Sequence, residues 1–202
     1  MITARGRGRK RVGYTRKMDT PLLDLALARE IELAEGEAAV ACARMRKALQ
    51  AEADSAVESI AGGYAVYCGA NSPVTQAVGL GLNGPVSTEE FDRLEEFYFS
   101  RNEAVRVETC PLADATLLEH YKERGYHVSE FSNVMVRGIA GDERFAMADG
   151  VEVRKAVPAE IELWTLTVAQ GFAEHFPVTA EMLSVMKMFA LGKNSELSLI
   201  HI

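Results

Sequence analysis

The sequence predicts a mixed α/β (α+β) fold in which a central sheet is flanked by helices. The chain has 202 residues, of which 48% are hydrophobic and 25% are charged, values that are typical of a folded globular protein. Stretches with apolar residues at helical spacing are separated by short runs that alternate in the manner of strands. Helix-starting signals and glycine-containing turns mark the boundaries between these segments. Strands alternating with helices favour a sheet that is covered by helices.

The first part of the chain predicts a long helical region followed by two strands. Asp19 or Thr20 can cap a helix with Pro21 in its first turn, and apolar residues then recur at helical spacing. Gly36 leaves open whether this region is one helix or two. The predicted elements are a helix from residue 22 to about residue 49, a strand over Tyr64–Cys68 and a strand over Ala77–Leu82.

The middle of the chain predicts two helices that alternate with strands. In the capping box Ser87-Thr-Glu-Glu90, the first and last residues can satisfy each other's backbone donors, so a helix begins there. Gly125 ends the second helix, because glycine readily takes the left-handed conformation found at helix ends. The predicted elements, in order, are the helix that begins at Ser87, a strand over Val105–Thr109, a helix over Asp114–Arg124 and a longer strand over Val128–Val136.

Composition divides the chain into four parts. Residues 138–150 contain three glycines and mixed charge, and we interpret them as a linker. A strand that begins at Val151, a helix that begins at Pro158 and a helix capped by Thr179 then start a second domain. The expected parts are a basic disordered tail at 1–17, a first domain at 18–137, the linker at 138–150 and the start of a second, incomplete domain at 151–202.

The two ends of the chain leave alternatives open. The first 17 residues carry seven basic side chains and no acidic one, which fits either a phosphate-binding arm or a translated leader upstream of a natural start at Met18. Leu197–Ile202 alternates as a strand does, and it also resembles the in-frame translation of a sequencing adapter. We expect the chain to be a fragment that ends inside its second domain.

Charge and composition argue against several classes of function. The chain carries 29 acidic and 22 basic residues, and seven of the basic ones lie in the first 17 positions, so the remaining body is acidic and repels nucleic acid. No stretch approaches the ~20 consecutive apolar residues that cross a membrane. The three cysteines are widely spaced and form no C-x-x-C pair, which predicts buried thiols in a reducing, cytoplasmic compartment and no metal site. They are Cys42, Cys68 and Cys110.

Two segments resemble motifs of the Gcn5-related N-acetyltransferase (GNAT) superfamily. His120-Tyr-Lys-Glu-Arg-Gly-Tyr126 is similar to the family pattern L-Y-x-x-x-G-F, and Val151-Glu-Val-Arg-Lys-Ala-Val-Pro-Ala-Glu160 is similar to its opening pattern V-x-[IV]-R-x-A-x-P-x-D. The chain thus resembles two tandem copies of this family. The resemblance implies a GNAT-like mixed central sheet flanked by helices, followed by the first strand and helices of a second GNAT-like domain. It also implies transfer of an acetyl group from acetyl-CoA to an amine.

The turn that would hold CoA departs from the family pattern. The family binds the pyrophosphate of CoA on a turn of the form [QR]-x-x-G-x-[GA], whose backbone N–H groups and following helix N-terminus form an anion site. The equivalent turn here is Asn83-Gly-Pro-Val-Ser87, in which Pro85 has no N–H to donate and Glu89 and Glu90 follow directly. The sequence therefore predicts that this turn caps a helix and that the first copy is degenerate. The corresponding turn of the second copy is expected beyond residue 202, so no cofactor-binding residue is assigned.

The resemblance also suggests candidate site residues. Tyr121 stands where the family often places the tyrosine that protonates the CoA thiolate, although it can equally pack on the sheet with its hydroxyl at the edge. Glu108, on an alternating strand, is either a general base or part of the solvent face. Phe172, His175 and Phe176 are candidates for the acceptor pocket of the second copy, and a lone histidine such as His175 also suits a helix C-terminus.

The function expected from the resemblance is that of an acyl-CoA-dependent N-acetyltransferase whose first copy is structural. Acetyl-CoA is the expected co-substrate, no metal is expected, and the acceptor is a small-molecule or peptide amine of unknown identity. This chain by itself is expected to be inactive, and its uncovered apolar faces favour self-association. The alternative is a non-catalytic GNAT-like module that binds a small ligand or a partner.

Overall fold

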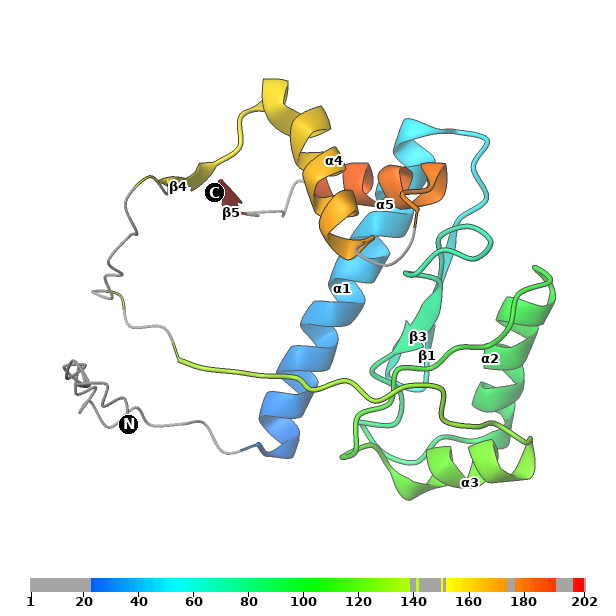
Figure 1. Ribbon diagram of the computed structural model, residues 1–202. Coiled ribbons are helices and arrows are strands. Elements are labelled where there is room, and N and C mark those ends of the chain that lie inside the picture. Colours follow the sequence, from blue (N-terminus) through cyan, green and yellow to red (C-terminus); the bar gives the residue numbers. More distant parts are fainter. Residues whose placement is uncertain are drawn as a thin grey trace, which may run out of the picture.

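The computed structural model describes residues 23–138, 141, 150, 152–173, 177–191 and 198–201. These residues form a mixed α/β fold (Figure 1). The helices are α1 (Leu25–Leu49), α2 (Thr88–Phe99), α3 (Ala115–Glu123), the short 3-10 helix η1 (Pro158–Glu160), α4 (Ile161–Phe172) and α5 (Ala180–Leu191). The strands are β1 (Ala56–Ile60), β2 (Gly63–Tyr67), β3 (Gln76–Val78), β4 (Glu152–Lys155) and β5 (Ser198–His201).

The main sheet has an antiparallel part and one parallel extension. Strands β1, β2 and β3 pair antiparallel in that order. Beyond β3, Ala77 forms a parallel bridge with Val107, in which the Ala77 N–H donates to the Arg106 carbonyl at 2.8 Å and the Glu108 N–H donates to the Ala77 carbonyl at 2.9 Å. The segment 105–109 thus continues the sheet in the direction parallel to β3, and α2 is the helix that connects the two.

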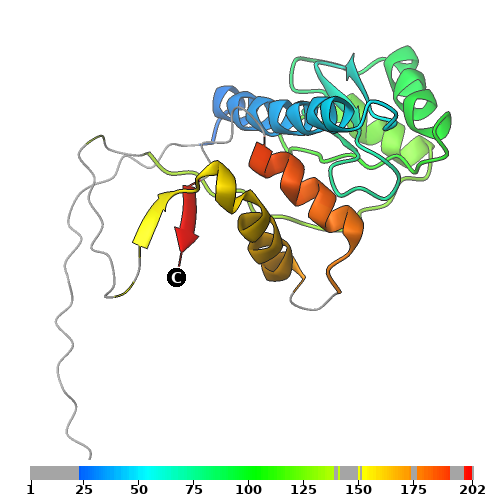
Figure 2. The same cartoon turned by 90° about the horizontal axis from the view of Figure 1, so that it is seen from above.

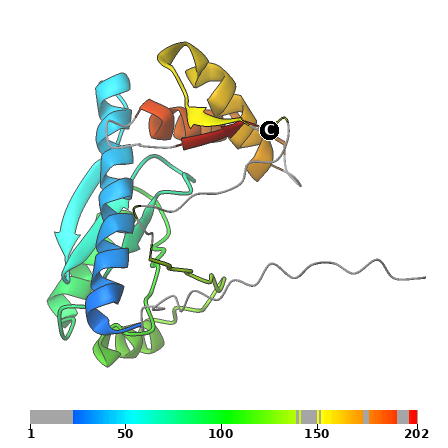
Figure 3. The same ribbon diagram turned by 90° about the vertical axis from the view of Figure 1, so that its left-hand side faces the viewer.

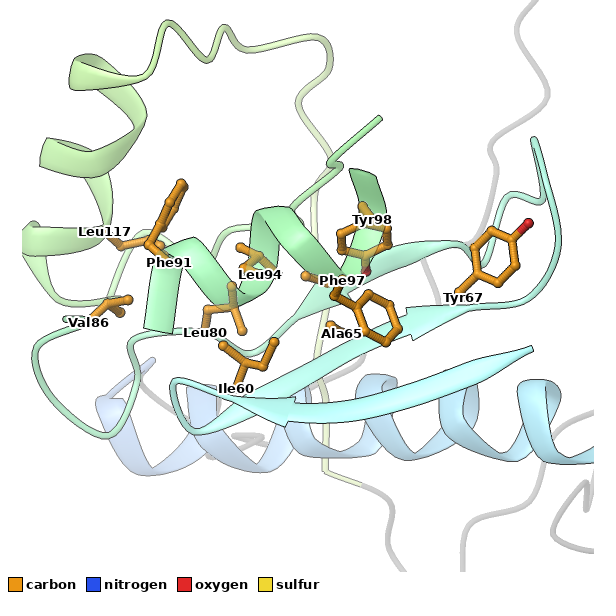
Figure 4. Close-up of a cluster of buried hydrophobic side chains, with 11 residues drawn as sticks. Ile60, Ala65, Tyr67, Leu80, Val86, Phe91, Leu94, Phe97, Tyr98 and Leu117 are labelled. Atoms are coloured by element: carbon orange, nitrogen blue, oxygen red, sulfur yellow. The ribbon is translucent and has the colours of Figure 1, made fainter. Parts of the chain in front are cut away.

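Helices cover both faces of this sheet. Helix α2 packs on one face, and α1 lies on the opposite face (Figure 4). The buried cluster on the α2 face consists of Ile60, Ala65, Tyr67, Ala77, Leu80, Val86, Phe91, Leu94, Phe97, Tyr98 and Leu117. The buried cluster on the α1 face consists of Ala39, Val40, Cys42, Ala43, Val66, Cys68, Val185 and Met188. Because Val185 and Met188 come from α5, that helix packs against α1 and contributes to the same core as the sheet.

Helix α1 is one continuous helix and does not break at Gly36. It begins after Asp24, whose side chain accepts from the Leu27 N–H at 2.8 Å, whereas the expected caps Asp19 and Thr20 lie outside the described residues. Gly36 is buried, and a Cβ atom there would lie 2.7 Å from the Tyr64 ring. The glycine therefore allows a close approach between the helix and β2 rather than ending the helix.

Three strand predictions need correction. The strand expected over Ala77–Leu82 ends at Val78, because Gly79 and Gly81 take positive φ angles that lead the chain out of the sheet. The strand expected over Val105–Thr109 is reduced to the single bridge at Val107. The strand expected over Val128–Val136 is absent: this segment has no assigned secondary structure, and its side chains are exposed. Strand β1 was not predicted from the sequence at all.

Four of the five predicted helix starts are confirmed, and the exception is the start of α1, which is capped by Asp24. Ser87 and Glu90 form both hydrogen bonds of the capping box at the start of α2, Asp114 caps α3, and Gly125 follows α3 with a φ of 75°. Pro158 opens η1 and α4, and the Thr179 hydroxyl accepts from the Met182 N–H at the start of α5. These signals act within one helical turn, which is why they can be recognised in the sequence.

Of the elements after residue 150, helix α5 lies directly against α1. Helix α4 packs on α5, and α5 packs on α1 (Figure 3). Arg46 on α1 forms a 2.8 Å ion pair with Glu181 on α5 and also donates to the Cys68 carbonyl of the loop after β2. Strands β4 and β5 pair antiparallel apart from the main sheet (Figure 2). The part expected to begin a second domain therefore shares a core with the first.

Candidate functional site

Four backbone donors in and around the turn between β3 and α2, which the GNAT resemblance marks as the position of a phosphate site, are already bonded within the protein. The Val86 N–H donates to the Thr116 hydroxyl at 2.9 Å, and the Ser87 N–H donates to the Glu90 carboxylate at 2.9 Å. The Glu90 N–H donates to the Ser87 hydroxyl at 3.2 Å, and the Gly81 N–H donates to the Ala61 carbonyl at 3.0 Å. These four N–H groups cannot be offered to a phosphate without breaking existing bonds.

The charge around this turn also opposes an anion. Glu89 and Glu90 occupy the first turn of α2, where the helix dipole otherwise favours a negative ligand. Pro85, two residues before the Ser87 cap, has no N–H to donate. The turn is further tied to α3, because the His120 ring donates through Nε2 to the Val86 carbonyl at 3.0 Å. The start of α2 is thus a capped helix N-terminus that is hydrogen-bonded to α3.

Tyr121 lies on the α2 face of the sheet, at the end of the segment 105–109. Its hydroxyl is 2.9 Å from the Thr109 hydroxyl, and its ring packs at 5.9 Å from Phe91 and 5.3 Å from Tyr126. Burial raises the pKa of Tyr121 to about 12, against a smaller lowering by the Thr109 hydrogen bond. The phenol therefore keeps its proton at neutral pH and can act as a hydrogen donor.

Glu108 lies in a half-buried group of acidic side chains between the sheet and α1. Its carboxylate accepts from the Gln76 amide at 3.0 Å, and its pKa is raised by burial and by the nearby Glu35. On α1, the pKa of Glu32 is likewise raised, mainly by burial and then by Glu108, against a hydrogen bond from the Gly79 N–H. One carboxylate oxygen of Glu32 is shielded from solvent and has no hydrogen-bond partner. Glu108 is therefore not on an open solvent face.

Tyr121 and Glu108 do not belong to one centre. Neighbouring residues of an extended segment point to opposite faces, so Thr109 and Tyr121 lie on the α2 face whereas Glu108 lies on the α1 face. An acid and a base on opposite faces of a sheet cannot act on the same substrate atom. The sequence missed Glu32, Thr109 and Gln76 as members of these groups, because each becomes relevant only through a contact with a distant segment.

The raised pKa values of Glu32 and Glu108 predict that stability falls as pH increases. A carboxyl whose pKa is higher in the folded state stabilises the fold below its ordinary value of 4.5, and that contribution is lost as pH rises through the raised value. Urea unfolding of the wild type and of Glu108→Gln between pH 4.5 and 7.5 tests this. The free energy of unfolding of Glu108→Gln should fall less steeply with pH, whereas Glu37→Gln, a change at an exposed residue of α1, should match the wild type. An unchanged slope in Glu108→Gln would contradict the prediction.

The candidates for the acceptor pocket are not assembled into a site. Phe172 ends α4, and its side chain is 70% exposed to solvent. His175 and Phe176 lie outside the described residues. Cys42 and Cys68 are buried free thiols whose sulfur atoms are 3.7 Å apart, and Cys110 is a half-buried free thiol, so the prediction of buried thiols is confirmed for two of the three.

The ranges that the structure describes contain no group of three or more His, Cys, Asp or Glu side chains that could hold a metal ion. Across the same ranges, no helix has both the length and the apolar character needed to cross a membrane. No family model, no curated protein and no solved structure matches the chain.

Proposed function

We propose that this chain belongs to an acyl-CoA-dependent N-acetyltransferase of the GNAT type, in which residues 18–137 are a structural copy. The order of the elements supports the proposal. Strand β3, a turn, the capped helix α2, the segment 105–109 and helix α3 with Tyr121 follow one another as the GNAT-like motifs do in the sequence. The parallel bridge between Ala77 and Val107 carries most weight, because parallel pairing through a helical crossover is a specific topology that no hairpin produces.

The chemistry of acetyl transfer explains why this copy is proposed to be structural. The amine nitrogen attacks the thioester carbonyl, the carbon–sulfur bond breaks, the amine loses a proton and the thiolate gains one. Tyr121 retains the proton that a leaving thiolate needs. The anion site at the start of α2 is closed by its own cap, and Glu108 lies on the other face. A proton donor without a phosphate site or a base cannot complete the reaction, so the catalytic centre is assigned to another part of the protein.

The chain is expected to bind acetyl-CoA with a dissociation constant weaker than about 10 μM, a free energy of roughly −7 kcal/mol. The reason is that four backbone donors in and around the β3–α2 turn are occupied and two carboxylates flank them. Isothermal titration calorimetry with acetyl-CoA measures this directly. Because Pro85→Gly with Glu90→Gln restores one N–H and removes one carboxylate, this double variant is the matched comparison and should bind more tightly than the wild type. Tight binding by the wild type would show that residues 18–137 are not a structural copy.

The enzymatic part of the proposal is tested on the protein as it is expressed from its own gene. Release of the free thiol of CoA from acetyl-CoA, in the presence of a panel of small amines and lysine peptides, should be faster than the rate without amine. A protein that binds amines but never releases CoA would favour the alternative, a non-catalytic module. The half-buried carboxylates of Glu32 and Glu108 favour a cationic ligand for such a module.

A further inference from the structure

The segment 105–109 leaves one edge of the main sheet open. Arg106 and Glu108 direct their backbone groups toward β3, so the backbone groups of Val105, Val107 and Thr109 face the other way. Within the described residues no further strand pairs on that side, although the Val107 carbonyl accepts a 3.5 Å hydrogen bond from the Thr109 hydroxyl. Such a row of N–H and C=O groups without a partner strand is a template for another extended chain.

A second unpaired element lies in the same chain. Residues 128–136 follow α3 as an exposed segment without assigned secondary structure, although their sequence predicted a strand. The side chain of Phe131 is 90% exposed and that of Met135 is 92% exposed, and Val128 and Val134 are also mostly exposed. A run of large apolar side chains open to water is unusual in a monomeric protein and indicates a surface that is covered by something else.

We propose that two copies of this chain pair by exchanging these elements, with residues 128–136 of each copy adding as a strand to the 105–109 edge of the other. The two elements are complementary. The 105–109 edge offers backbone donors and acceptors, and residues 128–136 offer an extended chain with apolar side chains. The exchange is reciprocal, as the two-fold symmetry of a dimer requires.

The neighbourhood of the edge suits such an addition. Val105 and Val107 are only partly buried where they pack on the core of the α2 face, and so are Tyr121 and Tyr126. An added strand would cover these side chains while its own apolar residues leave water. In the single chain both elements are present and neither pairs with the other, which favours a second copy as the partner. This inference is independent of the proposed function, because acetyl transfer does not require a dimer.

Association of the full chain tests the proposal. Sedimentation equilibrium over a range of concentrations should show a dimer that dissociates on dilution. The double variant Phe131→Ser with Met135→Ser should weaken dimerisation by roughly 100-fold, because two large apolar side chains no longer become buried. The monomeric form of this variant should unfold at the same denaturant concentration as the wild-type monomer, since both side chains are almost fully exposed. Phe172→Ser removes an exposed aromatic residue from α4 and is the matched control, which should dimerise like the wild type.

Hydrogen exchange identifies the interface. The amide hydrogens of Val107 and Thr109 should be protected at concentrations where the dimer forms, and should exchange fast in the double variant. A chain that stays monomeric at all concentrations overturns the proposal. So does a dimer in which these two amides still exchange fast, because association then uses another surface. Protection that is independent of concentration would mean that each chain pairs its own segment, and it too would overturn the exchange between copies.

Discussion

Replacing Phe91 with alanine is expected to lower the free energy of unfolding by about 3–5 kcal/mol. Phe91 is fully buried on α2 and lies where the sheet, α2 and α3 meet (Figure 4). Its ring stacks on His120 with a centroid distance of 4.9 Å and contacts Tyr121 and Tyr126 edge-on. The substitution removes the apolar surface of the ring and leaves a cavity that three rings line.

Phe99→Ala is the matched control for this change. Phe99 lies on the same helix, but its side chain is 58% exposed, so its removal should cost less than about 1 kcal/mol. Urea unfolding followed by circular dichroism compares the two variants with the wild type. If Phe91→Ala lost no more stability than Phe99→Ala, the packing of α2 and α3 on the sheet would be wrong.

Gly63→Ala is expected to destabilise the chain by about 2–4 kcal/mol, because the new side chain has no room. Gly63 pairs with Ile60 at the tight turn between β1 and β2. A Cβ atom at position 63 would lie 2.2 Å from the Val78 carbonyl oxygen and 2.6 Å from the Gly79 carbonyl carbon, and backbone atoms cannot move aside as the end of a flexible side chain can. The strain falls on the pairing of β2 with β3.

Gly171→Ala makes the same chemical change at a site with space. Gly171 lies in the last turn of helix α4, and a Cβ atom there would meet nothing within 4 Å. Alanine is preferred over glycine in a helix by up to about 1 kcal/mol, so this variant should be slightly more stable than the wild type. Thermal unfolding of the two variants should therefore move in opposite directions. A neutral Gly63→Ala would mean that β2 and β3 are not paired in this register.

Some features of the candidate site follow from local signals in the sequence, and others depend on distant segments of the chain. The position of Tyr121 on α3 follows from the cap at Asp114 and the glycine at position 125, both of which are visible in the sequence. Its hydrogen bond to Thr109 depends on where the segment 105–109 lies. The setting of Glu108 beside Gln76 and Glu32 depends on the same placement, and no local signal in the sequence indicates it.

What the sequence by itself determined are the starts of four helices. The capping box at Ser87, the cap at Asp114, the proline at 158 and the cap at Thr179 were all predicted and all confirmed, because each satisfies backbone groups within the next few residues. The mixed α/β composition of the fold could be predicted for the same reason, since helical and alternating patterns are local properties of the chain.

Only the tertiary structure decided which extended segments are strands. A strand needs a partner for its backbone groups, and the partner is set by distant parts of the chain. Val128–Val136 has the pattern of a strand but pairs with no described residue, whereas β1, which the pattern did not suggest, pairs along its whole length with β2. Gly36 shows the same dependence within a helix: α1 continues through it, and the absence of a side chain makes room for the ring of Tyr64, a residue of another element.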